Sequence, residues 1–184
     1  MQFDSDGNLK KDYPNLDLTL EYYRMLDPKM IVFFWNTEQY LDTKPESFSG
    51  EWEYFSDEWK VYFRDWLRDL VAHLKEKGWG YDKFAMYPYD EKLGTKVYNM
   101  AKLIKDIDPK IQIFVNSAGT LQEFKNIAPY VNIWCPNVYG FTPSYGVNVE
   151  EKNLLAGLLR EKDQFFWTYA NPEGGGDPKE ASPY

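Results

Sequence analysis

The feature that most constrains how this chain folds is a regular alternation between short apolar runs and longer segments with helical periodicity. The runs are hydrophobic at successive positions, which is typical of strands covered on both faces in a parallel sheet. Five such runs occur, at residues 30–35, 84–89, 111–115, 131–135 and 165–169. We therefore predict five buried strands separated by helices.

Helix signals lie in the segments around these runs. Ser56 is a suitable N-cap for a long amphipathic helix that stops at Gly78. A second apolar stripe starts at Leu93 and ends at Asp108, because the proline that follows Asp108 disfavours helical backbone before it. Shorter helices are predicted at residues 18–26, 121–127 and 150–160.

Strands that alternate with helices imply right-handed crossovers and a parallel sheet, so the fold class is α/β. Two architectures fit: a doubly wound sheet, and part of a (β/α)8 TIM-barrel-like fold. A dinucleotide-binding doubly wound sheet needs a G-x-G-x-x-G turn after a strand, and none of the five runs is followed by one. A complete barrel needs eight strands and about 250 residues. We therefore predict a partial barrel of about five parallel strands, forming one domain over residues 1–184.

The predicted barrel is incomplete at both ends. No strand is predicted before the opening helix at residues 18–26, and by count the first two strands and the last of a complete barrel are absent. A five-strand piece alone would leave strand edges and apolar faces open. We expect the missing strands to come from flanking sequence or from another chain, unless the barrel is degenerate.

Composition narrows the classes of partner. A net charge of −8 over 184 residues argues against nucleic acid, because proteins that bind phosphate backbones present clustered Lys and Arg. No apolar run approaches the roughly 20 residues of a membrane helix, and the N-terminus lacks the regions of a signal peptide. We interpret His73 as a helix residue satisfied by a partner, and Cys135 as a small buried residue. No cofactor or metal is predicted, although an all-carboxylate calcium or magnesium site stays open.

Ligands of parallel α/β folds bind at the carboxyl ends of the strands. Here those ends are rich in aromatic, amide and carboxylate side chains, which are the types that stack on sugar rings and bind sugar hydroxyls. An aromatic content of 18% also favours a carbohydrate ligand, although each aromatic side chain taken singly fits a core role. The candidate substrate-binding residues at these ends are Trp35, Asn36, Tyr89, Asn116, Trp134, Trp167 and Tyr169.

Asp90 and Glu91 form the one directly adjacent acid pair at a predicted strand end. Two carboxylates held close in a partly dry site cannot both ionise easily, so one becomes a proton donor beside an anion. Glycosidases divide acid and base roles in this way. The alternative is that Asp90 caps the following helix and Glu91 lies in its first turn, which are positions that both residue types favour.

Three segments resemble the catalytic barrel of glycoside hydrolase family 123 and its bacterial relatives. They are residues 87–91 (Tyr-Pro-Tyr-Asp-Glu), residues 131–134 (Val-Asn-Ile-Trp) and residues 166–172 (Phe-Trp-Thr-Tyr-Ala-Asn-Pro). The resemblance covers roughly residues 80–172. It implies a (β/α)8 barrel that acts on β-linked N-acetylhexosaminides of the N-acetylgalactosamine type, in a secreted or periplasmic location.

The resemblance also implies roles for the acid pair. Glu91 would be the general acid/base, and Asp90 would orient the substrate's 2-acetamido group, whose carbonyl oxygen attacks the anomeric carbon. This substrate-assisted scheme is one of the exceptions to the usual carboxylate nucleophile. By the same analogy Tyr139 or Tyr169 would bind the acetamide, and Trp134 or Trp167 would contact its methyl group. Two alternatives stay open: a non-catalytic carbohydrate-binding or structural partial-barrel module, and a glycosidase in which Glu91 works with a remote carboxylate.

Overall fold

The computed structural model describes residues 2–3, 9–35, 53–90, 93–116, 120–135, 156–157, 160 and 165–166. The chain opens with a small antiparallel pair, β1 (Gln2–Phe3) and β2 (Leu9–Lys10). The remaining elements, in chain order, are α1 (Pro14–Leu26), β3 (Ile31–Phe34), α2 (Asp57–Glu76), β4 (Phe84–Tyr87), α3 (Thr95–Ile107), β5 (Gln112–Val115), α4 (Leu121–Ile127), β6 (Ile133–Trp134) and β7 (Phe165–Phe166). No helix in these ranges is long and apolar enough to cross a membrane.

The main sheet has five strands in the order β3-β4-β5-β6-β7, and every neighbouring pair is parallel. Sequential order means that each crossover moves one strand further in the same direction. Because such crossovers are right-handed, they place the helices on one side of the sheet, as in the wall of a barrel. A doubly wound sheet reverses direction and carries helices on both faces. The predicted partial barrel is therefore confirmed.

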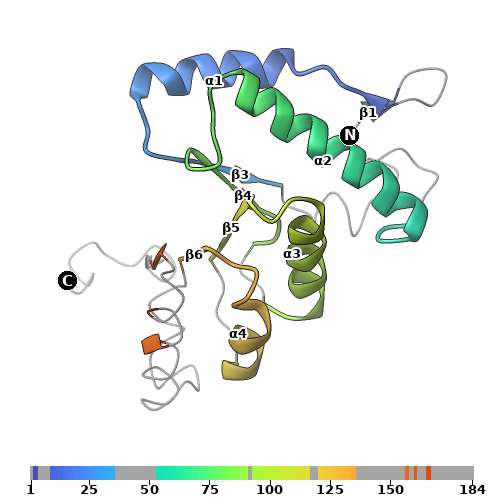
Figure 1. Cartoon of the computed structure of the whole chain (residues 1–184), viewed down its shortest axis with the longest axis vertical. Coiled ribbons are helices and arrows are strands. Elements are labelled where there is room, and N and C mark those ends of the chain that lie inside the picture. The colour runs from blue at the N-terminus through green and yellow to red at the C-terminus, as the bar shows by residue number, and fades with distance from the viewer. Residues whose placement is uncertain are drawn as a thin grey trace, which may run out of the picture.

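Packing agrees with this topology. The helices α1 to α4 lie around the strands β3 to β6 (Figure 1). One core contains residues of these helices together with Phe84, Met86, Ile113 and Trp134 of the sheet. A second, smaller cluster lies on the opposite face of the sheet and is built from Ala85, Tyr87, Phe114 and Ile133. Along β3 the same alternation leaves Val32 and Phe34 exposed while Ile31 is buried. We call the first surface the helix side and the second, made of these six residues, the inner face.

Several predicted boundaries are confirmed. The Ser56 hydroxyl caps α2 by accepting a hydrogen bond from Trp59 N at 3.2 Å, and Gly78 follows the helix with φ 84°. Asp108 is the C-cap of α3. The predicted helix at residues 121–127 is α4, which begins with a reciprocal capping box between Thr120 and Glu123. Residues 156–157 and 160 of the predicted helix at 150–160 are helical.

The N-terminal region differs from its prediction. The opening helix starts at Pro14 rather than residue 18, with the proline in the first turn, where its missing N–H costs nothing. The expectation of no preceding strand was wrong, since the β1–β2 pair precedes α1, although it lies outside the parallel sheet. Its two-residue strands are too short for period-two alternation to be recognised in the sequence.

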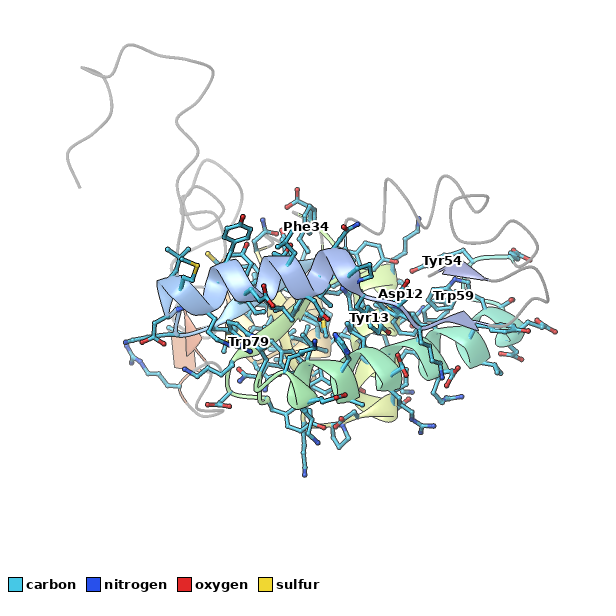
Figure 2. The ribbon with its side chains drawn as sticks, turned by 90° about the horizontal axis from the view of Figure 1, so that it is seen from above. Asp12, Tyr13, Phe34, Tyr54, Trp59 and Trp79 are labelled. Atoms are coloured by element: carbon cyan, nitrogen blue, oxygen red, sulfur yellow. The ribbon has the colours of Figure 1, made fainter. Side chains whose placement is uncertain are left out.

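The helices α1 and α2 lie side by side (Figure 1 and Figure 2), and polar contacts join them. The Asp17 carboxylate accepts from Lys77 Nζ at 2.7 Å and lies 2.6 Å from His73 Nε2. The Tyr13 hydroxyl donates to Asp69 Oδ2 at 2.8 Å, and its ring lies 4.7 Å from the His73 ring. His73 is thus a helix residue satisfied by partners, as predicted.

Candidate active site

Asp90 lies just beyond the carboxyl end of β4, exposed to solvent. The helix that follows begins at Thr95, and its N-cap is Gly94, with φ 131°. Asp90 is therefore four residues before the N-cap and does not cap this helix. The alternative that explained Asp90 by a capping role is wrong.

The Asp90 carboxylate is held on one side. Its Oδ1 accepts a hydrogen bond from the Tyr87 hydroxyl and another from Asn116 Nδ2 at 3.0 Å. Tyr87 is the last residue of β4, the strand that precedes Asp90, whereas Asn116 directly follows the neighbouring strand β5. Two strands therefore fix the plane of one carboxylate. Within the described ranges Oδ2 has no such partner, so this oxygen can accept a hydrogen bond from a ligand.

The surroundings of Tyr87 on the inner face are aromatic. Its ring centroid lies 4.8 Å from that of Phe34 and 4.9 Å from that of Phe114. Phe34 pairs with Tyr87 in the sheet register and is 47% exposed. The site thus combines a fixed carboxylate with an exposed aromatic ring on the adjacent strand, an arrangement suited to a ligand with both polar and apolar surfaces.

Three of the predicted substrate-binding residues lie on the helix side. Trp35 packs edge-on against Phe63 and Trp66 of α2, at 5.8 and 5.5 Å between ring centroids. Trp134 is fully buried, and Tyr89 is 1% exposed with its hydroxyl hydrogen-bonded to Tyr54. Packing accounts for the positions of all three side chains. That they bind substrate stays a prediction, and their places on the helix side do not support it.

Asn116 is the predicted binding residue that the structure does bring to Asp90. Its amide reaches the carboxylate from the neighbouring strand, so it positions the acid instead of lying apart from it. Five other predicted site residues lie outside the described ranges: Asn36, Glu91, Tyr139, Trp167 and Tyr169.

Sequence reasoning missed Tyr87 and Phe34. In the sequence Tyr87 belongs to an apolar run, which predicts a buried strand residue. Its hydroxyl, three residues before an aspartate at the strand end, indicates a candidate hydrogen-bond donor to that aspartate. Phe34 is one residue from Trp35, and a continuous apolar run does not show which of two neighbours faces the helices. Once the register is known, strand alternation assigns Phe34 to the inner face.

Two further observations concern chemistry at this site. No group of three or more His, Cys, Asp or Glu side chains in the described part of the chain could hold a metal ion. Cys135, which follows β6, is half-buried against the inner-face cluster, and burial raises the pKa of its thiol. At neutral pH this favours the unreactive thiol over the thiolate.

Fold and site together define a class of protein: a barrel-type α/β domain with a carboxylate displayed at a strand end, which is where enzymes of this architecture carry catalytic groups. The family model for the glycoside hydrolase 123 catalytic domain matches residues 1–176. The chain belongs to this family, and it has the fold of a glycoside hydrolase catalytic domain. The resemblance seen in the sequence motifs is thereby confirmed. No curated protein matches the chain.

Proposed function

We propose that this chain hydrolyses β-linked N-acetylhexosaminides of the N-acetylgalactosamine type by a substrate-assisted, retaining mechanism. In this proposal Glu91 protonates the leaving oxygen and then activates water. Asp90 accepts a hydrogen bond from the acetamide N–H, so that the acetamide carbonyl oxygen attacks the anomeric carbon. The proposal includes a secreted or periplasmic location, which the family resemblance implies and fractionation of the producing cells would test.

The observation that carries the proposal is the one-sided support of Asp90. Two donors bind Oδ1, and Oδ2 has no partner among the described residues, so an incoming group can bind there. An acid that orients an amide needs this geometry, because an unsupported carboxylate would rotate and lose the direction of its hydrogen bond. The attack is intramolecular because the acetamide belongs to the same sugar, and its orientation by Asp90 brings the nucleophilic oxygen close to the anomeric carbon.

The inner face supports the same reading. The exposed Phe34 ring and the Tyr87 ring beside it offer apolar contact next to a polar group. An N-acetyl sugar has this combination of surfaces, with a methyl group and axial C–H groups close to an amide. A simple hexose has no amide for Asp90 to orient.

Hydrolysis of an aryl N-acetyl-β-galactosaminide tests the proposal. Loss of general acid catalysis in Glu91→Gln should lower kcat about 10²- to 10⁴-fold. Asp90→Asn should cost about 10²-fold or more, by analogy with loss of a polar group that stabilises a transition state. The aryl β-galactoside, which lacks the acetamide, should be a very poor substrate of the unaltered chain.

Asp106→Asn repeats the Asp90→Asn substitution on the exposed surface of α3 and serves as its matched control. It should keep full activity. Unchanged turnover in Glu91→Gln, or equal turnover of the two aryl glycosides, would show that the proposed mechanism is wrong. Binding of the sugar without any turnover by the unaltered chain would instead favour a carbohydrate-binding module.

Exposed apolar side chains support a further part of this proposal, that additional strands complete the barrel. Leu18, Tyr22, Met25 and Leu26 form one stripe along α1, and all are more than half exposed. Contiguous apolar surface of this kind marks an interface. β3 is also an edge strand of the described sheet, so a further strand can pair with its open side. We propose that elements from flanking sequence or from another chain cover the α1 stripe and extend the sheet at β3.

A further inference from the structure

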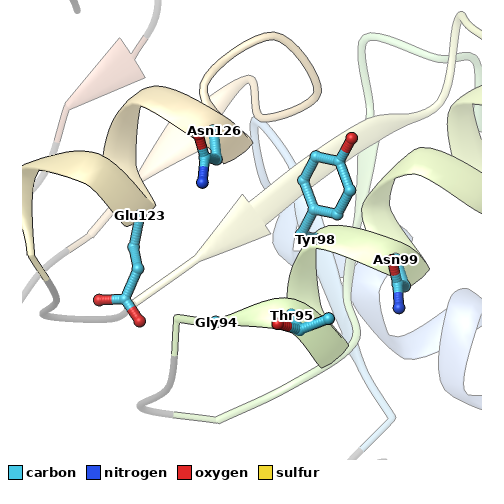
Figure 3. Close-up of a pocket in the computed structure, with 6 residues that line it drawn as sticks. All are labelled: Gly94, Thr95, Tyr98, Asn99, Glu123 and Asn126. Carbon is cyan, nitrogen blue, oxygen red and sulfur yellow. The ribbon is translucent and has the colours of Figure 1, made fainter.

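A polar hollow of about 500 Å³ lies between α3 and α4 (Figure 3). Gly94, Thr95, Tyr98 and Asn99 line it from the start of α3, and Glu123 and Asn126 line it from α4. Its volume falls in the range of about 300–1,000 Å³ that is typical of small-molecule sites. It is separate from the inner face, because its walls are the helices that cover the other side of the sheet.

The hollow offers unused hydrogen-bonding groups. In the part of the chain that the structure describes, the Asn99 amide and the Thr95 hydroxyl have no hydrogen-bond partner. Glu123 uses Oε2 to accept from Thr120 N at 2.8 Å and from Thr120 Oγ1 at 2.9 Å, and Oε1 remains available within the same ranges. Oε1 lies 3.8 Å from where a Cβ on Gly94 would stand, so it faces the Gly94 wall of the hollow.

The chemistry of the lining selects a class of ligand. Asn126 Oδ1 accepts from Gln122 Nε2 at 2.8 Å, which leaves the Asn126 NH2 group as a donor. Together with the Asn99 amide, the Thr95 hydroxyl and Glu123 Oε1, it can bind several hydroxyl groups as donors and as acceptors. The Tyr98 ring is fixed by an edge-to-face contact of 5.6 Å with Tyr130 and adds a rigid amphipathic surface. The described residues that line the hollow include no Lys or Arg, which favours a neutral ligand over phosphate or sulfate. A neutral, hydroxyl-rich molecule fits these groups.

The hollow is also tied to the candidate active site through both of its walls. Gly94, the N-cap of α3, is four residues after Asp90, and Thr120, the N-cap of α4, is four residues after Asn116. Four residues span at most about 14 Å, even fully extended. A short oligosaccharide can bridge such a distance.

We propose that this hollow is a distal glycan subsite, which binds a neutral sugar further along the chain whose terminal N-acetylhexosamine lies at Asp90. The inference rests on the proposed function for its account of the terminal sugar. It assigns Asn99 and Asn126 to hydroxyl recognition, and it makes the chain selective for oligosaccharides over single sugars.

The test compares Asn99→Ala with the unaltered chain on two substrates. One is an aryl N-acetyl-β-galactosaminide, and the other is a neutral tetrasaccharide that ends in β-linked N-acetylgalactosamine. Loss of one hydrogen bond should raise KM for the tetrasaccharide roughly three- to tenfold. Both kcat and KM for the aryl glycoside should stay unchanged. Asn15→Ala on α1 makes the same change far from the hollow and should alter neither substrate.

A binding measurement separates failure of the subsite from failure of the proposed function. Affinity for the same tetrasaccharide is measured by calorimetry in the Glu91→Gln background, with and without Asn99→Ala. A weaker affinity in the Asn99 variant supports the subsite even if no chain turns over substrate, a result that would overturn the proposed function alone. Equal affinities, or equal KM values for the tetrasaccharide, would overturn the subsite.

Discussion

The hydrogen bond between the Tyr54 and Tyr89 hydroxyls gives a sharp test of how the strand end beside Asp90 is held. Tyr89 directly precedes Asp90 and is 1% exposed, whereas Tyr54 is half-buried. Tyr54 also packs edge-on against Trp59 of α2, at 5.1 Å between ring centroids. The bond thus ties the residue before the candidate acid to the long helix, over 35 residues of sequence.

The magnitude follows from burial. Tyr54→Phe leaves a nearly inaccessible hydroxyl on Tyr89, and an unsatisfied buried polar group costs about 1–3 kcal/mol. Both tyrosines make other contacts, so we expect the lower half of this range. Tyr89→Phe leaves a hydroxyl on the half-buried Tyr54, which water can reach, and should cost about 0.5–1.5 kcal/mol. The double variant should cost less than the sum, with a coupling of about 1 kcal/mol.

Urea unfolding followed by tryptophan fluorescence measures all four free energies. The slope of free energy against urea concentration should stay constant, because the surface exposed on unfolding does not change. Tyr22→Phe, on the exposed stripe of α1, is the control and should stay within about 0.5 kcal/mol of the unaltered chain. A coupling below about 0.3 kcal/mol, the level of independent sites, would refute this account of the strand end.

Three further outcomes are expected. Asn116→Ala should lower kcat/KM for the aryl substrate at least tenfold, because a hydrogen bond to the charged Asp90 contributes about 1.5–3 kcal/mol; retained activity would contradict its positioning role. Burial lowers the pKa of Lys105 from 10.5 to about 8. The free energy of unfolding of the unaltered chain, measured with urea and compared with that of Lys105→Met, should therefore increase as the pH rises from about 8 to 10.5. A difference between the two chains that does not change with pH would contradict this. Hydrogen bonds from Lys77 and, to a smaller extent, from His73 lower the pKa of Asp17 below 3.8. The unaltered chain should therefore melt at a higher temperature than Asp17→Asn above pH 3.8, and this difference should disappear as the pH falls through the lowered pKa. A difference in melting temperature that persists in acid would refute this role of Asp17.

The order and type of the main elements could be predicted from the sequence, because they depend on local signals. Ser56 caps its helix through its own hydroxyl, and α4 begins at the Thr120 capping box. The strands are recognisable because parallel strands covered on both faces need continuous apolar residues. These signals act within a few residues, so tertiary packing does not override them.

The sequence could not predict which side chains of each strand point to the helix side and which point to the inner face. The run at residues 30–35 is apolar throughout, so nothing local separates Phe34 from Trp35. Only the contact of Trp35 with α2, and the pairing of Phe34 with Tyr87, settles which one faces the helices. A site residue predicted from a continuous apolar run can face either side of the sheet. Trp134 is a second example, because it is fully buried on the helix side.

Asp90 shows the opposite case, in which the local signal favoured the wrong explanation. Asp is a favoured N-cap and a helix does follow, but the helix begins only after Gly94. Asp90 instead accepts hydrogen bonds from Tyr87 and Asn116. The hydrogen bond from Asn116 joins the ends of two strands that are distant in sequence, so local sequence patterns cannot predict it.

The site therefore depends on the pairing of β4 with β5. This register matches Ala85 with Gln112 and Met86 with Ile113. A shift of one residue would move each inner-face side chain of β5 to the helix side, and would carry Asn116 away from Asp90. Ile113 is fully buried on the helix side, so the same core that stabilises the sheet also prevents this shift. The position of the candidate acid is consequently fixed by the sheet itself.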